Sequence, residues 1–182
     1  MFSLRHGILV RAPIQRCFAL STHLAVVERT LGMHPVEGRT GGMVTSGDTI
    51  RWEGIQLGFF NYHVSLIVPE TWDPPYSFQD RMIAGRFRTF EHDHRFIETE
   101  NGTFVDDCIR FTMPLGRPGD LVGRMILVPH ILGQMRRRFE LLKHLAETEE
   151  WRDYLHSFVV EPRRSSAASH SSRGAHESRR SA

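Results

Sequence analysis

The stretch TFEHDHRFIETENGTFVDDCIRFTM, residues 89–113, decides the fold. Its side chains alternate between two faces with a period of two, which is typical of β-strands. The central Asn101-Gly102 pair is a strong signal for a tight turn between antiparallel strands. The stretch therefore predicts a β-hairpin. The two more apolar faces carry Phe90, His92, His94 and Phe96 on the first strand, and Thr103, Val105, Asp107, Ile109, Phe111 and Met113 on the second.

The same period extends upstream to Thr49 and predicts further strands of an antiparallel meander. One expected strand has Phe60, Tyr62, Val64, Leu66 and Val68 on its apolar face, opposite Asn61, His63 and Ser65. The next expected strand has Tyr76, Phe78, Asp80 and Met82 on one face. The glycine-rich segment 37–48 lacks the G-K-[ST] of a phosphate-binding loop, so we interpret it as a turn between strands.

Helices are expected at both ends of this sheet. Phe2 to Val10 has strand character, Pro13 suits the first residue of a helix, and Ser21 or Thr22 can cap a second helix that runs through Leu31. Residues 121–146 carry an apolar stripe at alternating spacings of four and three, which indicates one long helix. Pro129 should kink or divide it. The stripe consists of Leu121, Met125, Val128, Leu132, Met135, Phe139, Leu142 and Ala146.

The order of these elements predicts an α+β fold. A curved antiparallel sheet of about six to seven strands would wrap around the long C-terminal helix, with two short helices after the first strand. The apolar face of the sheet has to be buried against that helix. A curved sheet leaves room between the two layers, and the room would be lined by Phe, Met and Leu. Concave apolar spaces of this kind are the usual sites for small molecules.

Three regions are expected along the chain: a domain over residues 1–149, an amphipathic extension over 150–162, and a disordered tail over 163–182. The tail has no Leu, Ile, Val or aromatic residue, so it cannot bury enough apolar surface to fold. The extension either folds back onto the domain or presents an exposed patch to a partner or a membrane surface. Its apolar residues are Trp151, Tyr154, Leu155 and Phe158.

Composition excludes several classes of protein. No apolar run reaches the roughly 18 residues of a membrane span. Cys17 and Cys108 are too few for a disulfide scaffold and lack metal-site spacing, so we expect a cytoplasmic protein. Five of the arginines lie in the tail, and the rest of the chain is slightly acidic, which argues against nucleic-acid binding. Peripheral membrane contact and a homodimer remain open.

Four polar residues share the apolar strand faces: Asp80, His92, His94 and Asp107. If all three faces turn inward, two imidazoles and two carboxylates meet in the cavity, where buried charges must be paired. Three interpretations stay open: a structural network that fixes the strand register, recognition of a ligand's polar group, and chemistry by acid–base catalysis or a metal. These four residues are therefore candidate catalytic residues only.

The expected ligand-lining residues come from the strands and the long helix. We expect no metal at His92 and His94, because two imidazoles and two carboxylates can neutralise one another as hydrogen-bonded pairs. No cofactor is expected, since no G-x-G-x-x-G follows a strand. His63 and His130 suggest ordinary surface or loop histidines. The predicted lining consists of Tyr62, Val64, Phe78, Phe90, His92, His94, Phe96, Phe111, Met135 and Phe139.

Residues 76–139 contain the motifs that carry a family resemblance. These are Phe78-Gln79-Asp80-Arg81, Gly85-Arg86-Phe87, Phe90-Glu91-His92-Asp93-His94-Arg95-Phe96, Thr103, Asp107, Phe111 and Pro114-Leu115-Gly116. The stretch resembles the START-like or SRPBCC superfamily, which includes the polyketide cyclase/dehydrase and lipid-transport proteins, the birch-pollen allergens and the coenzyme-Q-binding START-domain relatives. The resemblance implies a helix-grip fold with a hydrophobic cavity.

Two functions follow from these expectations. The first is binding or transport of a hydrophobic small molecule, such as a lipid, a quinone or a polyketide, with no catalysis. The alternative is an enzyme of the cyclase/dehydratase kind that uses Asp80, His92, His94 and Asp107 as acid–base residues in the same cavity. The resemblance implies that both kinds of protein share this fold, and fold alone does not choose between them.

Overall fold

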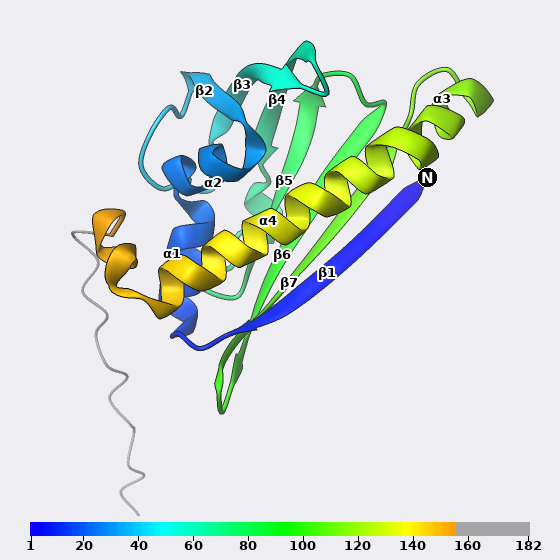
Figure 1. Cartoon of the computed structure of the whole chain (residues 1–182). Coiled ribbons are helices and arrows are strands. Elements are labelled where there is room, and N and C mark those ends of the chain that lie inside the picture. Colours follow the sequence, from blue (N-terminus) through cyan, green and yellow to red (C-terminus); the bar gives the residue numbers. More distant parts are fainter. Residues whose placement is uncertain (156–182) are drawn as a thin grey trace, which may run out of the picture.

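Seven antiparallel strands form one curved sheet in the computed structural model, which describes residues 1–155 (Figure 1). Their order across the sheet is β1-β7-β6-β5-β4-β3-β2. From β2 to β7, strands that follow one another along the chain are therefore also neighbours in the sheet. The strands are β1 (Phe2–Val10), β2 (Met33–Gly38), β3 (Thr49–Gln56), β4 (Phe59–Ile67), β5 (Ser77–Ala84), β6 (Thr89–Thr99) and β7 (Gly102–Thr112).

Helices cover only one face of the sheet. The long helix α4 (Val128–Glu147), yellow in Figure 1, crosses that face, with α1 (Ile14–Thr22) and α2 (Leu24–Leu31) beside it. The short helix α3 (Arg117–Val122) and the π-helical turn η2 (Gly123–Leu127) lead into α4. Single 3₁₀ turns, η1 (Pro69–Thr71) and η3 (Glu149–Asp153), complete the described chain. This arrangement confirms the predicted fold class.

The β6–β7 hairpin has the predicted turn and the predicted inward faces. Phe90 pairs with Phe111, His94 pairs with Asp107, and the strands close at Thr99 and Gly102. Phe111 has no exposed surface, and its ring stacks on Phe2 of β1 at a centroid distance of 4.9 Å. Burial of the Phe faces on both strands fixes the register, because a slip by one residue would turn every one of these rings to solvent.

The prediction for β4 was wrong about which face turns inward. Phe60 is 58% exposed and Tyr62 is 44% exposed on the convex face, whereas Ser65 is buried and His63 lines the cavity. Tyr62 and Val64 are therefore not lining residues. The period of two identifies residues that share a face, but it does not say which face the helices cover. Here the inward face is the more polar one, because it borders the cavity instead of a packed core.

The apolar stripe of the last helix is not continuous. Leu121 and Met125 are 59% and 69% exposed, whereas Met135, Phe139 and the rest of the stripe toward Ala146 are buried or partly buried. The turn η2 ends at Leu127, two residues before Pro129. In a regular α-helix the ring of a proline clashes with the carbonyl group four residues earlier, so a break before Pro129 is expected. The exposed end of the stripe thus lies in α3 and the π-helical turn, before α4 begins.

The second helix also begins later than predicted. Thr22 is the last residue of α1, and its hydroxyl donates to the carbonyl groups of Phe18 and Ala19. His23, not Ser21 or Thr22, stands at the N-cap of α2, and no side chain caps that helix. The Thr22 hydroxyl thus turns back toward its own helix, as Ser and Thr hydroxyls inside helices often do.

The described part of the C-terminal extension folds back onto the domain. Leu155 is buried, and Trp151 and Tyr154 pack against the same core cluster. The guanidinium group of Arg16 lies 4.5 Å from the centre of the Trp151 ring. Phe158 and the tail lie outside the described residues, and the domain limits remain a prediction. No helix among residues 1–155 is long and apolar enough to span a membrane.

Candidate functional site

A cavity of about 380 Å³ lies between the concave face of the sheet and the helices α2 and α4. Its size and its position between layers fit a small-molecule site. Most of its wall is apolar, and polar side chains gather on the strands at its centre. The apolar wall includes Leu24, Val27, Leu31, Val44, Ile50, Ile67, Phe78, Phe87, Phe90, Ile109, Met113, Ile131 and Met135.

The polar side of the cavity is built by three neighbouring strands and α4. Strand pairing places Asp80 of β5 opposite His92 of β6, and His94 of β6 opposite Asp107 of β7. Arg138 reaches this group from α4. The structure thus brings together all four polar residues that the sequence singled out, on one inward face.

His94 is the centre of the network. Its Nδ1 lies 2.9 Å from Oδ1 of Asp107, and its Nε2 lies 3.3 Å from Oδ2 of Asp80. Burial on its own would lower the pKa of His94, but the Asp107 charge and the hydrogen bonds to both carboxylates outweigh it and raise the pKa. When the imidazole is protonated, it can donate one N–H to each carboxylate.

The pKa of His92 is shifted in the opposite direction. Burial lowers its pKa, and the charge of His94, whose ring centre is 3.8 Å away, lowers it further. Its Nε2 lies 3.2 Å from Oδ2 of Asp107, yet it has no hydrogen-bond partner of good geometry. The neutral His92 imidazole is therefore the least satisfied polar group of the cluster.

Arg138 and Asp107 form the buried base of the site. The Asp107 side chain is only 1% exposed, and its Oδ2 accepts a hydrogen bond of 2.7 Å from Nη1 of Arg138. Burial would raise the pKa of Asp107, but the charges of Arg138 and the two histidines hold it well below its usual value. Asp80 also has a lowered pKa, because the hydrogen bond and charge of His94, with the nearby His92, outweigh its burial.

The pKa values of the two histidines should be shifted in opposite directions. We expect NMR titration to place the pKa of His94 above 6.5 and that of His92 below it, with His94→Gln and His92→Gln providing the assignments. Because the folded-state pKa of His94 is raised, its stabilising contribution is present below pH 6.5 and is lost as the pH rises through the folded-state pKa. Equal midpoints for the two imidazoles would contradict the network described above.

The structure divides the ten predicted lining residues into three groups. Phe78, Phe90, His92, His94 and Met135 line the cavity. Phe96, Phe111 and Phe139 are inward-facing but belong to the packed core beside it, with no more than 2% exposure. Tyr62 and Val64 lie on the convex face.

Sequence reasoning missed several polar residues of the cavity. Arg138 follows Met135 by three positions, so it borders the apolar stripe, and that spacing was the available signal. His63 and His130 both line the cavity, contrary to their interpretation as surface or loop residues. Burial lowers the pKa of each. The polar lining also includes Asn61, Ser65, Arg86 and Gln134.

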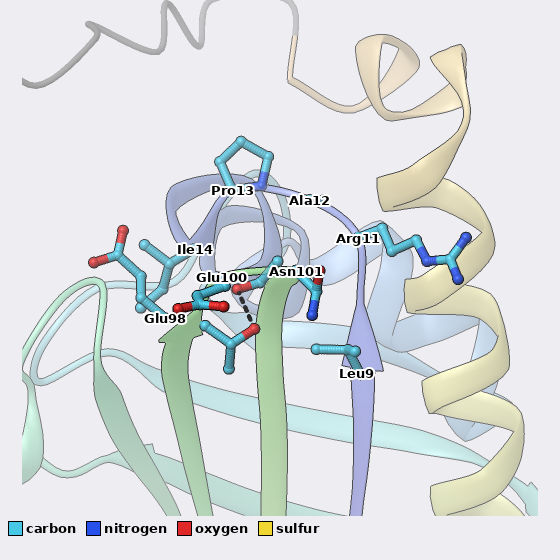
Figure 2. A pocket seen from close by; sticks show the side chains of 10 residues that line it. Leu9, Arg11, Ala12, Pro13, Ile14, Glu98, Glu100 and Asn101 are labelled. Carbon is cyan, nitrogen blue, oxygen red and sulfur yellow. Dashed lines mark hydrogen bonds between the residues drawn. The ribbon is translucent and has the colours of Figure 1, made fainter.

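A second, open hollow lies where the β6–β7 hairpin meets the turn between β1 and α1 (Figure 2). The Thr99 hydroxyl donates to the carbonyl group of Gly102 there. Figure 2 shows Arg11 pointing away from Glu98 and Glu100, so no set of polar groups converges in this hollow. We assign it no ligand.

No family model matches the sequence, and no curated protein matches it either. Solved structures do match. TTHA0849 from Thermus thermophilus is 18% identical with a TM-score of 0.62, over 79% of this chain and 95% of that one. The di-domain ARO/CYC BexL from the BE-7585A biosynthetic pathway is 17% identical with a TM-score of 0.64, over 81% of this chain and 50% of BexL. Ara h 8.0201 is 11% identical with a TM-score of 0.54, over 80% and 97%.

At such low sequence identity, these matches show that the backbone folds are similar. They do not show that the chemistry of the site is the same. The matches cover about four-fifths of the chain. The chain has a helix-grip fold, which it shares with these solved structures.

Proposed function

We propose that this protein binds a hydrophobic small molecule that carries one polar group. The observation that carries the proposal is the cavity of about 380 Å³, whose largely apolar wall includes the polar pair of Asp80 and His92. An apolar molecule of suitable size gains free energy by leaving water for such a wall. A polar group on it could form hydrogen bonds with Asp80 and His92, which would fix its orientation in the cavity.

The surroundings of the cavity support this function. Leu57 and Phe59, at the β3–β4 turn, line the cavity although they are 48% and 68% exposed. Apolar residues that are both exposed and part of the lining are suited to an entrance for an apolar ligand. The START-like resemblance and the shared fold support the same class of function, because the superfamily includes carriers of lipids and quinones.

The ligand's polar group is expected to be a hydrogen-bond donor. The Asp80 carboxylate keeps 27% of its side chain exposed to the cavity, whereas Asp107 is almost fully enclosed by its partners. A hydroxyl group on the ligand can donate to Asp80, and the neutral His63 nearby can accept or donate a second bond. A ligand hydroxyl therefore fits better than a carboxylate, which Asp80 would repel.

Filling the cavity should abolish binding. Val27 of α2 lines the cavity, and Val27→Trp adds an indole to it. We expect this variant to bind the neutral apolar probe Nile red at least tenfold more weakly than the unaltered protein, in a fluorescence titration. Val36→Trp is the matched control, because Val36 is half-exposed on β2 outside the cavity. Equal probe binding by both variants would remove the cavity as the site.

A second candidate is an enzyme of the cyclase/dehydratase kind. It is favoured by the neutral His92 imidazole, which can accept a proton next to the Asp80 carboxylate in a water-poor cavity. The ARO/CYC proteins among the similar structures come from biosynthetic pathways. Recovery of the bound compound decides between the two functions: a carrier returns it unchanged, and an enzyme returns a dehydrated or cyclised product.

A further inference from the structure

Three ligand-type atoms converge at the polar side of the cavity. Oδ2 of Asp80 lies 3.3 Å from Nε2 of His94 and 3.6 Å from Nδ1 of His92. One donor atom from each of these three residues can be chosen so that all lie within 4.8 Å of one another. They come from two adjacent strands, which hold them more firmly than loops would.

These separations suit a metal ion. Bonds of about 2.0–2.2 Å from a divalent metal to imidazole nitrogen and carboxylate oxygen, at tetrahedral or octahedral angles, place donor atoms about 3.0–3.5 Å apart. Both Asp80–histidine separations are within about 0.1 Å of that range. For all three donor atoms to contact one metal ion, the donor nitrogens of the two imidazoles would have to move closer to each other.

Asp107 lies beside the opposite nitrogen of each imidazole, and it has a hydrogen bond of good geometry with that of His94 only. Its Oδ1 lies 2.9 Å from Nδ1 of His94, and its Oδ2 lies 3.2 Å from Nε2 of His92. A carboxylate behind a metal-binding histidine fixes the ring and makes it a better donor. One carboxylate serves both rings here, and Arg138 anchors it.

We propose that Asp80, His92 and His94 form a binding site for a divalent transition metal. Two imidazoles and one carboxylate favour Zn²⁺, Fe²⁺ or Co²⁺ over Mg²⁺ and Ca²⁺, which prefer oxygen donors. Three protein ligands leave at least one coordination position for water or for an oxygen of a molecule in the cavity. The site goes beyond the proposed binding function and does not depend on it.

Charge supports a cation at this point. With both imidazoles neutral, the two aspartates and Arg138 leave a net charge of −1 in the cluster. Arg138 contacts Asp107 and Nδ1 of His94, which is the imidazole nitrogen opposite the converging one. The expectation of no metal came from pairing the charges of the four side chains. That pairing does not take into account that one donor atom each from Asp80, His92 and His94 lie within 4.8 Å of one another.

The test uses the full-length protein, purified without an affinity tag and freed of metal by a chelator. We expect isothermal titration calorimetry with ZnCl₂ to show one equivalent bound, and CoCl₂ to give the visible absorption bands of a bound ion. Asp80→Asn and His92→Ala should each weaken Zn²⁺ binding at least tenfold. His34→Ala, which removes an exposed histidine of β2 outside the cavity, should leave the Zn²⁺ affinity unchanged.

Circular dichroism of each metal-free variant establishes that it is folded. If His92→Ala is unfolded, the Zn²⁺ affinity of Asp80→Asn tests the proposal, because an amide keeps the shape of the carboxylate. Absence of stoichiometric Zn²⁺ and Co²⁺ binding, or binding that survives Asp80→Asn, would overturn the proposal. Val27→Trp should keep the metal site while it loses Nile red, so failure of this site and failure of the apolar ligand site can be told apart.

Discussion

Replacing Arg138 by leucine should lower the free energy of unfolding by about 3–5 kcal/mol. The reason is that Asp107 is only 1% exposed, and its hydrogen bond of 2.7 Å to Arg138 is its contact with a permanently charged group. Without that partner, a buried carboxylate is left with two imidazoles, of which only His94 has a raised pKa. Chemical denaturation monitored by circular dichroism measures the change.

Two companion variants show whether the effect comes from the lost charge pair. Arg137→Leu removes a neighbouring, exposed guanidinium and should change the free energy of unfolding by less than about 0.5 kcal/mol. In the double variant Asp107→Asn/Arg138→Leu the loss should be clearly smaller than the sum of the two single losses, because the charge pair is removed as a whole. A loss below about 1 kcal/mol for Arg138→Leu would show that the histidines alone neutralise Asp107.

The hairpin around Asn101-Gly102 shows how far sequence patterns reach. The turn fixes the pairing, so His94 must lie opposite Asp107 once the hairpin forms. Period-two patterns then place His92 and Asp80 on the same inward side. The four candidate polar residues were predictable for that reason: each lies in a strand whose apolar neighbours identify the buried face.

Arg138 was not predictable in the same way. The spacing of the long helix placed it beside the apolar stripe, but its partner Asp107 lies 31 residues away and comes close only when the helix crosses the sheet. That crossing is a contact between elements far apart in the sequence. No local pattern in the sequence sets that geometry, so the buried charge pair becomes visible only in three dimensions.

The β4 strand shows where a correct alternation led to a wrong prediction. Its apolar alternation was correct, but the face with Phe60 and Tyr62 is the exposed one, because the cavity takes the polar face with His63 and Ser65. A rule that turns apolar residues inward assumes that the inside is a packed core. In a fold with a cavity, some inward positions must instead carry hydrogen-bonding groups.

Phe111→Ala and Phe60→Ala together test this distinction, since both shorten a phenylalanine in a strand of the sheet. Phe111 has no exposed surface and packs against Phe2 and Phe87, so its loss should lower the free energy of unfolding by about 3–5 kcal/mol. Phe60 is 58% exposed on the convex face, and its loss should change the free energy by less than about 1 kcal/mol. Urea denaturation of the two variants gives the comparison. A loss of about 3 kcal/mol or more for Phe60→Ala would mean that its face of β4 is buried, and the sequence-based assignment would then be the correct one.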